Sequence, residues 1–161
     1  MKVLAFDQST KVTGWSVFTE GAYVDSGVLD LSKNKNTEER SKQMGLEMCK
    51  VITDNKPDVV IIEEVAMQSN AQTLKLLARI QGVAIGFCAA HDIPLHILAP
   101  TKWRSTLQYK QGNKVKRDEL KRQSFDYVRE HFGFDHFSED RCEAICINVA
   151  AQKIFDFEDE I

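Results

Sequence analysis

Several signatures of common functional classes are missing from this sequence of 161 residues. Its four cysteines form no CxxC pair, which argues against a structural zinc site. The apolar run at the N-terminus is short and is interrupted by Asp7, so it does not fit the core of a signal peptide. We expect no run of membrane-spanning length, and we find no internal repeat or low-complexity stretch. With no export signal, we expect reduced thiols and a cytoplasmic location.

The chain also lacks the overall excess of basic residues that nucleic-acid-binding proteins usually show, because its formal net charge is −3. The distribution is uneven, however. Residues 101–122 hold eight lysine and arginine residues against two acidic ones, a net charge of +6, which leaves −9 for the remainder. This polarity favours a phosphate-binding face on an otherwise acidic protein. The alternative is a basic helix that is simply solvated.

A hydrophobic fraction of 43% and a charged fraction of 28% predict a soluble globular chain, which at this length forms one domain, residues 1–161. Alternation and turn residues predict strands near 2–6, 13–20 and 22–31, with a turn at Glu20-Gly21. Asn36 and Glu39 are spaced as a capping box and open a helix. Strands are expected at 58–62 and 94–98, and helices at 71–90, 115–131 and 139–155.

This order of elements predicts an α/β protein with a five-stranded mixed sheet and helices on both faces. With right-handed crossovers the strand order is 3-2-1-4-5. The helix at 71–90 is apolar nearly all round after Arg79, and a sheet covers only one side of a helix. We therefore expect a homodimer through residues 70–90, where Gly82, Ala84 and Gly86 are small. A fully internal helix is the alternative.

Acidic residues stand at the ends of three separate elements of this predicted sheet. Asp7 ends the first strand, Glu63 and Glu64 end the fourth, and Asp140 and Glu143 open the last helix one turn apart. The first and fourth strands are parallel neighbours in the expected order, so their carboxyl ends lie side by side. Carboxylates gathered in one place favour Mg²⁺ or Mn²⁺, and two such ions are typical of phosphodiester hydrolysis.

Each acidic cluster also has a simpler interpretation. Asp7 can belong to an Asx turn, and the two glutamates can be a solvated strand end. Asp140 and Glu143 have the spacing of a helix N-cap and its N3 partner. Taken together, three clusters at element ends that the topology brings to one edge favour a functional site.

The segments that carry these acids resemble the RuvC-like Holliday junction resolvases of phage-encoded type, in the RNase H-like and retroviral integrase superfamily. FDQSTKVTGWSVF is similar to the opening strand pair, IIEEVAMQSNAQTLKLLARIQGVAI to the fourth strand and dimerisation helix, and EDRCEAICI to the terminal helix. The resemblance spans nearly the whole chain. Two residues depart from the family pattern: Glu143 replaces a frequent aspartate, and Ala66 stands where bacterial members tend to carry an aromatic that wedges into the junction.

The resemblance implies a structure-selective endodeoxyribonuclease that resolves four-way junctions and other branched DNA, leaving 5′-phosphate and 3′-hydroxyl ends. It implies that the catalytic metal ligands are Asp7, Glu63, Asp140 and Glu143, with Glu63 chosen over Glu64. It further implies a homodimer that acts in the host's cytoplasm if phage-encoded, with no nucleotide cofactor and no membrane. The residues expected on the DNA backbone are Arg104 and Lys116, with Lys114, Arg117, Lys121 and Lys102 as looser candidates.

Other functional classes remain as alternatives. The sugar kinase and actin-like ATPases share this fold, but nothing in the sequence supplies a second half or a glycine-rich adenosine loop. A flap or general branched-DNA nuclease without paired cleavage, and a non-catalytic junction-binding relative, would both keep the expected fold. Retention of all four acids favours a nuclease over the non-catalytic relative.

Overall fold

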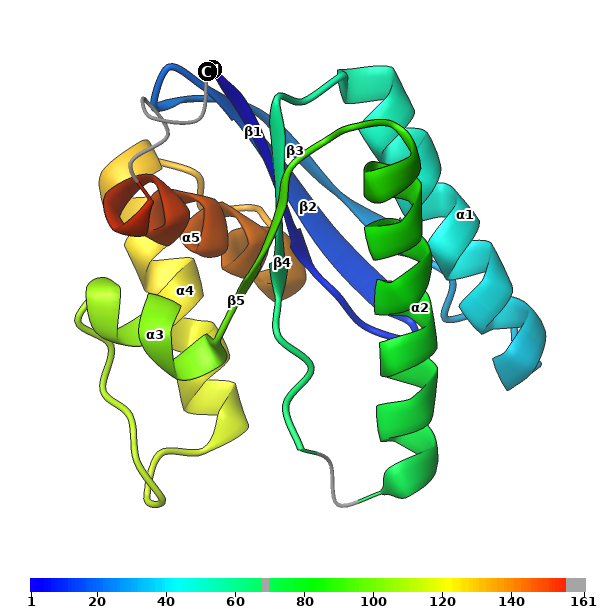
Figure 1. Cartoon of the computed structure of the whole chain (residues 1–161). Helices are drawn as coiled ribbons and strands as arrows, with labels where there is room; N and C mark the ends of the chain where they lie inside the picture. The colour runs from blue at the N-terminus through cyan, green and yellow to red at the C-terminus, as the bar shows by residue number, and fades with distance from the viewer. Residues whose placement is uncertain (68–69, 156–161) are drawn as a thin grey trace.

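The structure is a computed structural model, described here for residues 1–67 and 70–155. A single mixed sheet has the order β3-β2-β1-β4-β5, which confirms the expected topology (Figure 1). Its strands are β1 (Lys2–Asp7), β2 (Val12–Thr19), β3 (Ala22–Asp30), β4 (Val59–Glu63) and β5 (Leu95–Leu98). The first three strands form an antiparallel meander, and β4 and β5 run parallel to β1. The carboxyl ends of β1 and β4 therefore meet at one edge.

Helices cover both faces of the sheet (Figure 1). One face carries α1 (Thr37–Asn55) and α2 (Ala71–Ala90), and the other carries α3 (Pro100–Thr106), α4 (Arg117–Phe132) and α5 (Glu139–Ile154). The short helix α3 was not expected from the sequence. Its clearest local signal is Pro100 in the first turn, a position where proline costs no hydrogen bond.

Local capping explains where two segments turn. Both residues of the β2–β3 turn have positive φ, 50° at Glu20 and 73° at Gly21, as a tight hairpin requires. Asn36 caps α1, since its side chain accepts a hydrogen bond from the backbone N–H of Glu39 at 3.1 Å. The backbone N–H of Asn36 donates to the side chain of Asn34. The predicted helix start is therefore confirmed, with Asn34 in the reciprocal role that a capping box gives to Glu39.

Alternation along the central strands divides the core into two layers. Leu4 and Phe6 of β1 pack with α1 and α2, whereas Val3 and Ala5 pack with α5 and with Trp103 of α3. All four β1 residues are fully buried or nearly so. A strand covered on both faces reads as a continuous apolar run, which is why β1 and β4 were recognisable from the sequence.

The helix α2 has one buried face and one open face. Ile80, Ala84 and Cys88 lie against the sheet, but the side chains of Val83 and Ile85 are 43% and 38% exposed. The fully internal alternative is therefore wrong for this chain. The expectation that Ala84 faces a second protomer is also wrong, because Ala84 is 0% exposed within its own core.

The length and composition of α2 also bear on the expected absence of a membrane-spanning run. By these two criteria alone, α2 is long and apolar enough to cross a bilayer, with a mean hydropathy of 1.3 over an 18-residue window of its 20 residues, so that expectation was too strong. One such helix is weak evidence for a membrane span, because the core helices of soluble proteins pass the same test.

Candidate metal centre

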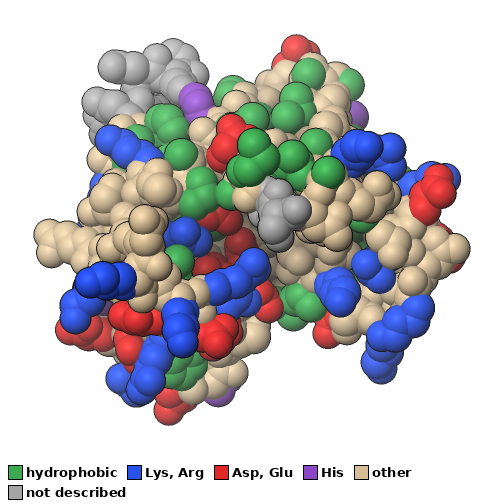
Figure 2. Space-filling view, turned by 90° about the horizontal axis from the view of Figure 1, so that it is seen from below, with side chains coloured by type: hydrophobic (Ala, Val, Ile, Leu, Met, Phe, Trp, Pro, Cys, Tyr) green, Lys and Arg blue, Asp and Glu red, His purple; other side chains and the backbone are tan. Residues whose placement is uncertain are grey.

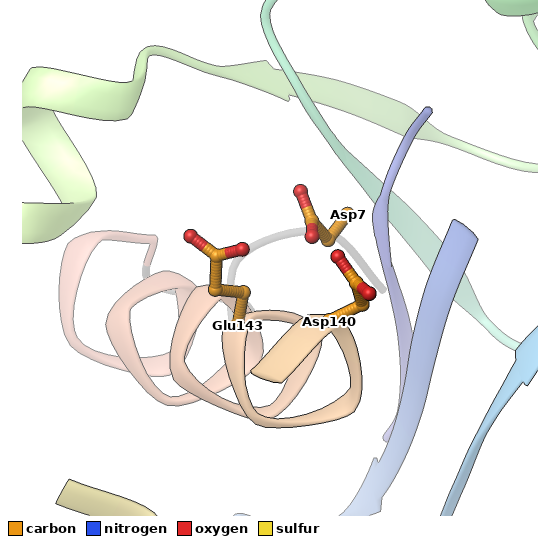
Figure 3. A group of neighbouring side chains, drawn as sticks. All are labelled: Asp7, Asp140 and Glu143. Carbon is orange, nitrogen blue, oxygen red and sulfur yellow. The ribbon is translucent and has the colours of Figure 1, made fainter. Parts of the chain in front are cut away.

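Three of the predicted acids converge at the carboxyl edge of the sheet. Asp7 comes from the end of β1, and Asp140 and Glu143 come from the first turn and a half of α5 (Figure 3). One carboxylate oxygen from each residue lies within 4.8 Å of the other two. Hard oxygen donors at this spacing are the ligands that divalent cations such as Mg²⁺ or Mn²⁺ prefer. The acidic cluster is therefore fit to bind a metal ion.

Glu63 borders this cluster from the neighbouring strand. Its strand β4 is paired in parallel with β1, with Ile62 opposite Phe6, so Glu63 follows in step beside Asp7. An oxygen of Glu63 accepts a hydrogen bond of 2.9 Å from the indole N–H of Trp103. The guanidinium of Arg104 lies 3.7 Å from the same oxygen. Glu63 is thus held at the edge of the cluster by two residues of α3.

Glu64 behaves differently from Glu63. It is exposed, and its side chain accepts a hydrogen bond from the backbone N–H of the next residue, Val65. The side chain of Glu63 is only 16% exposed. Because side chains alternate along a strand, this difference is consistent with the choice of Glu63 as the acid that belongs to the site.

The electrostatics of the cluster follow from burial and from like charges. Burial raises the pKa of Asp7 well above its ordinary value, and the charges of Glu143, Glu63 and Asp140 raise it further. Burial also raises the pKa of Glu143, although the ammonium of Lys121 and the guanidinium of Arg104 oppose this. Acids that repel each other in a buried place need a cation among them.

Lys121 of α4 supplies one such cation. Its Nζ lies 3.0 Å from an oxygen of Asp140 and 3.9 Å from an oxygen of Glu143. Burial lowers the pKa of Lys121, but the hydrogen bond and the charge of Asp140 outweigh burial, so the net pKa is raised. The sequence identified Lys121 only as a candidate for DNA contact, and the structure places it among the acids.

Close packing of α5 on the sheet fixes Asp140 and Glu143. Gly14 of β2 lies so near the backbone of Asp140 that a side chain on it would strike the carbonyl oxygen. The Ser16 hydroxyl donates to the carbonyl oxygen of Ala144 at 2.8 Å. The buried amide of Asn148 donates to the backbone oxygens of Val3 and Ser16. These contacts tie the start of α5 to β1 and β2.

The N-cap of α5 settles one of the simpler interpretations. Ser138 is the cap, and its hydroxyl accepts a hydrogen bond of 3.4 Å from the backbone N–H of Arg141. Asp140 and Glu143 are therefore not the N-cap and its N3 partner. Both lie inside the helix, on the side that meets Asp7.

A cleft of about 310 Å³ is lined by three of the acids, Asp7, Glu63 and Glu143, together with Arg104 and Arg117. Figure 2 views this end of the molecule, with acidic side chains in the hollow and lysine and arginine side chains on either side. A second hollow, of about 580 Å³, lies on the other side of the start of α4 and includes Lys110, Lys116 and Arg122. Lys102 and Lys114 are exposed.

Comparisons with known proteins show which family this chain resembles. Residues 3–119 match the family model described as crossover junction endodeoxyribonuclease RuvC. The protein of that name from Vibrio vulnificus (strain YJ016) is 33% identical over 98 residues, covering 58% of this chain and 56% of the relative. That from Pelodictyon phaeoclathratiforme is 31% identical over 111 residues, covering 66% of this chain and 58% of the relative. The chain thus spans a little over half the length of these curated relatives.

Two solved structures share the fold. The structure described as T. thermophilus RuvC in complex with Holliday junction substrate superposes with a TM-score of 0.72 at 16% identity, covering 94% of this chain and 93% of that one. The yeast mitochondrial Holliday junction resolvase gives a TM-score of 0.56 at 16% identity, covering 92% and 76%. Asp7 and Glu63 lie inside the segment that the family model matches, whereas Asp140 and Glu143 lie beyond it.

Proposed function

The chain belongs to the RuvC family and has its RNase H-like fold, and from this premise we propose that it is a structure-selective endodeoxyribonuclease. Its substrates are Holliday junctions and other branched DNA, which it hydrolyses to give 5′-phosphate and 3′-hydroxyl ends. The observation that carries this proposal is the meeting of Asp7, Asp140 and Glu143, with Glu63 beside them, next to a cleft that Arg104 and Arg117 help to line. We further propose that residues 1–161 form one nuclease domain that acts in the cytoplasm, the host's if the protein is phage-encoded.

Two Mg²⁺ or Mn²⁺ ions per active site are the proposed cofactors, held by Asp7, Glu63, Asp140 and Glu143. When bound, the ions activate water and neutralise charge on the phosphate that is cleaved. The chain's own residues prepare this site. Trp103 orients Glu63 by donating its indole N–H to one carboxylate oxygen.

The basic residues fall into distinct roles in this proposal. Arg104 and Arg117 lie in the cleft, where they can contact the phosphate next to the acids. Lys116 lies outside the cleft and contacts more distant phosphates, which adds affinity without sequence information. The full set proposed for DNA contact is Arg104, Lys116, Lys114, Arg117, Lys121 and Lys102.

The open face of α2 supports a homodimer. Gly82, Ile85, Gly86 and Ala89 are exposed along it, and a side chain on either glycine would meet open space. A twofold contact through this face brings identical patches together and gives two active sites for two symmetric nicks. We expect a sedimentation mass near twice 18.3 kDa.

Magnesium-dependent nicking of a synthetic four-way junction tests the function. We expect Asp7→Asn and Glu63→Gln to abolish nicking and to leave junction binding intact or tighter, since each removes a metal ligand and a charge that repels phosphate. The matched control is Glu64→Gln, which removes the same charge one residue away and should remain active.

Three outcomes would contradict parts of the proposal. Binding without nicking by the wild-type protein would favour a non-catalytic relative. Unpaired nicks on flaps and simple branches would favour a nuclease without coordinated cleavage. An inactive Glu64→Gln beside an active Glu63→Gln would shift the assignment of the β4 ligand by one residue.

A further inference from the structure

Lys121 is unusual among the lysines of this chain because its charge is turned inward. It lies on α4, and its side chain is 17% exposed. Its ammonium is within 4.0 Å of three carboxylates of α5, those of Glu139, Asp140 and Glu143. The closest of these, to Asp140, is also a hydrogen bond of 3.0 Å. A role in DNA contact alone does not explain this position.

The contacts of Lys121 involve two of the four proposed metal ligands. The oxygens of Asp140 and Glu143 that approach its ammonium belong to carboxylates that a divalent cation must also engage. Three of the four acids lie within one small cluster, where like charges repel strongly and water is partly excluded. An ammonium in this place keeps the acids together when no metal is bound, and for the same reason it opposes metal binding.

We propose that Lys121 is the resident counter-cation of the metal centre, and that it competes with the divalent cation for Asp140 and Glu143. The inference rests on the proposed function, since it takes these acids as metal ligands. In the metal-free protein the ammonium lies against both carboxylates. When a divalent cation binds these carboxylates, the ammonium of Lys121 moves away from them.

The position of Lys121 on α4 indicates where the displaced ammonium goes. Arg117 and Leu120 line the cleft, and Lys121 follows on the same helix face as Arg117, one turn later. A flexible side chain released from Asp140 therefore reaches the cleft in which a DNA phosphate lies beside the metal centre. Metal loading and phosphate contact are then coupled through one lysine.

Metal binding without DNA tests the proposal directly. Calorimetric titration of Mn²⁺ into the wild-type protein, Lys121→Gln and Lys121→Met measures affinity, and thermal melting of the metal-free proteins measures stability. We expect both variants to bind Mn²⁺ about tenfold more tightly, within the usual range of coupling between two competing ligands. We expect their metal-free melting temperatures to fall, because the acids lose their counter-cation.

Two controls separate competition from a general charge effect. Lys114→Gln makes the same charge change at an exposed position and should change neither measurement. Lys121→Arg keeps a cation and should stay near the wild-type affinity. In nicking assays Lys121→Gln should reach half-maximal rate at a lower Mg²⁺ concentration, even if its maximal rate falls.

The proposal fails if the wild-type protein binds Mn²⁺ and the glutamine and methionine variants bind it no more tightly. Weaker binding in both variants would show that Lys121 assembles the site and does not compete for it. If the wild-type protein bound no Mn²⁺ at all, the metal centre itself would be refuted, and the proposed function with it. Should metal-free Lys121→Gln not fold, titration of Lys121→Met decides between these outcomes.

Discussion

Replacing Gly14 by alanine tests whether the packing of α5 on β2 sets the geometry of the acidic cluster. A Cβ on Gly14 would lie 2.1 Å from the carbonyl oxygen of Asp140, 2.7 Å from its carbonyl carbon and 3.2 Å from the Cβ of Ala144. Both closest atoms are backbone, so no flexible side chain can move aside. A close-packed interior has no free space for the added methyl group, so the start of α5 must move away from β2 by roughly 1 Å.

That retreat acts on stability and activity by separate routes. Overpacking of a core typically costs about 1–3 kcal/mol of unfolding free energy. Asp140 and Glu143 lie on the displaced turn, and misplacing catalytic groups by about 1 Å can reduce turnover by a factor on the order of 100. Urea unfolding and single-turnover nicking of a four-way junction at saturating Mg²⁺ measure the two effects.

Gly45→Ala is the matched control for Gly14→Ala. The three atoms nearest to a Cβ on Gly45 all belong to the side chain of Val83, at 3.1–3.3 Å, on the opposite face of the sheet from α5. It also gains about 0.5–1 kcal/mol from helix propensity, which offsets the crowding. We expect wild-type turnover from this variant. Wild-type turnover and stability in Gly14→Ala would refute the view that this contact positions the acids.

Three further predictions follow from the structure. Lys116→Ala should lower the steepness of the plot of log affinity against log salt by about 0.9, measured by junction binding at several salt concentrations. Arg104→Ala should instead lower turnover more than affinity. Ile85→Glu should shift the sedimenting species towards monomer and keep its fold, whereas Ala84→Glu should unfold the protein, because Ala84 is buried in its own core. Melting of the wild-type protein and of Asp7→Asn without added metal should show that the wild type loses stability relative to the variant as the pH rises above 3.8, because the raised pKa of Asp7 makes the folded state hold a proton that the unfolded state releases. A stability difference that does not change with pH would contradict the raised pKa of Asp7.

The parts of the fold that were predictable from the sequence are those in which burial leaves a periodic trace. The buried runs of β1 and β4 are apolar without interruption, so the point at which each run stops is visible as an acid. Right-handed crossovers then place the two strands side by side, so the acids that end them, Asp7 and Glu63, are predicted to be neighbours. On α5 the same helix spacing that buries Ile147 and Ala150 also directs Glu143 towards the sheet.

The parts that were not predictable depend on how short elements dock. The seven residues of α3 are too few to show a helical period, so nothing in the sequence indicated that Trp103 would be buried with its N–H on Glu63. The expectation that the sheet covers only one side of α2 is confirmed, since Val83 and Ile85 are exposed on the other side. The rotation of the helix about its axis was not predicted. Gly82, Ala84 and Gly86 are all small, and of these only Ala84 lies against the sheet.

Residues 101–122 show why composition alone could not assign the basic side chains. Their net charge of +6 suggests a uniform face for DNA, yet the docking of α3 and α4 turns Lys121 onto Asp140 and Glu143, and Arg104 onto Glu63. In the structure these two cations therefore neutralise the chain's own acids. We propose that divalent cations take over this neutralisation and leave both side chains available to phosphate. The charge that the cleft presents to DNA then depends on metal loading, so the salt dependence of junction binding should be steeper with metal bound than without it.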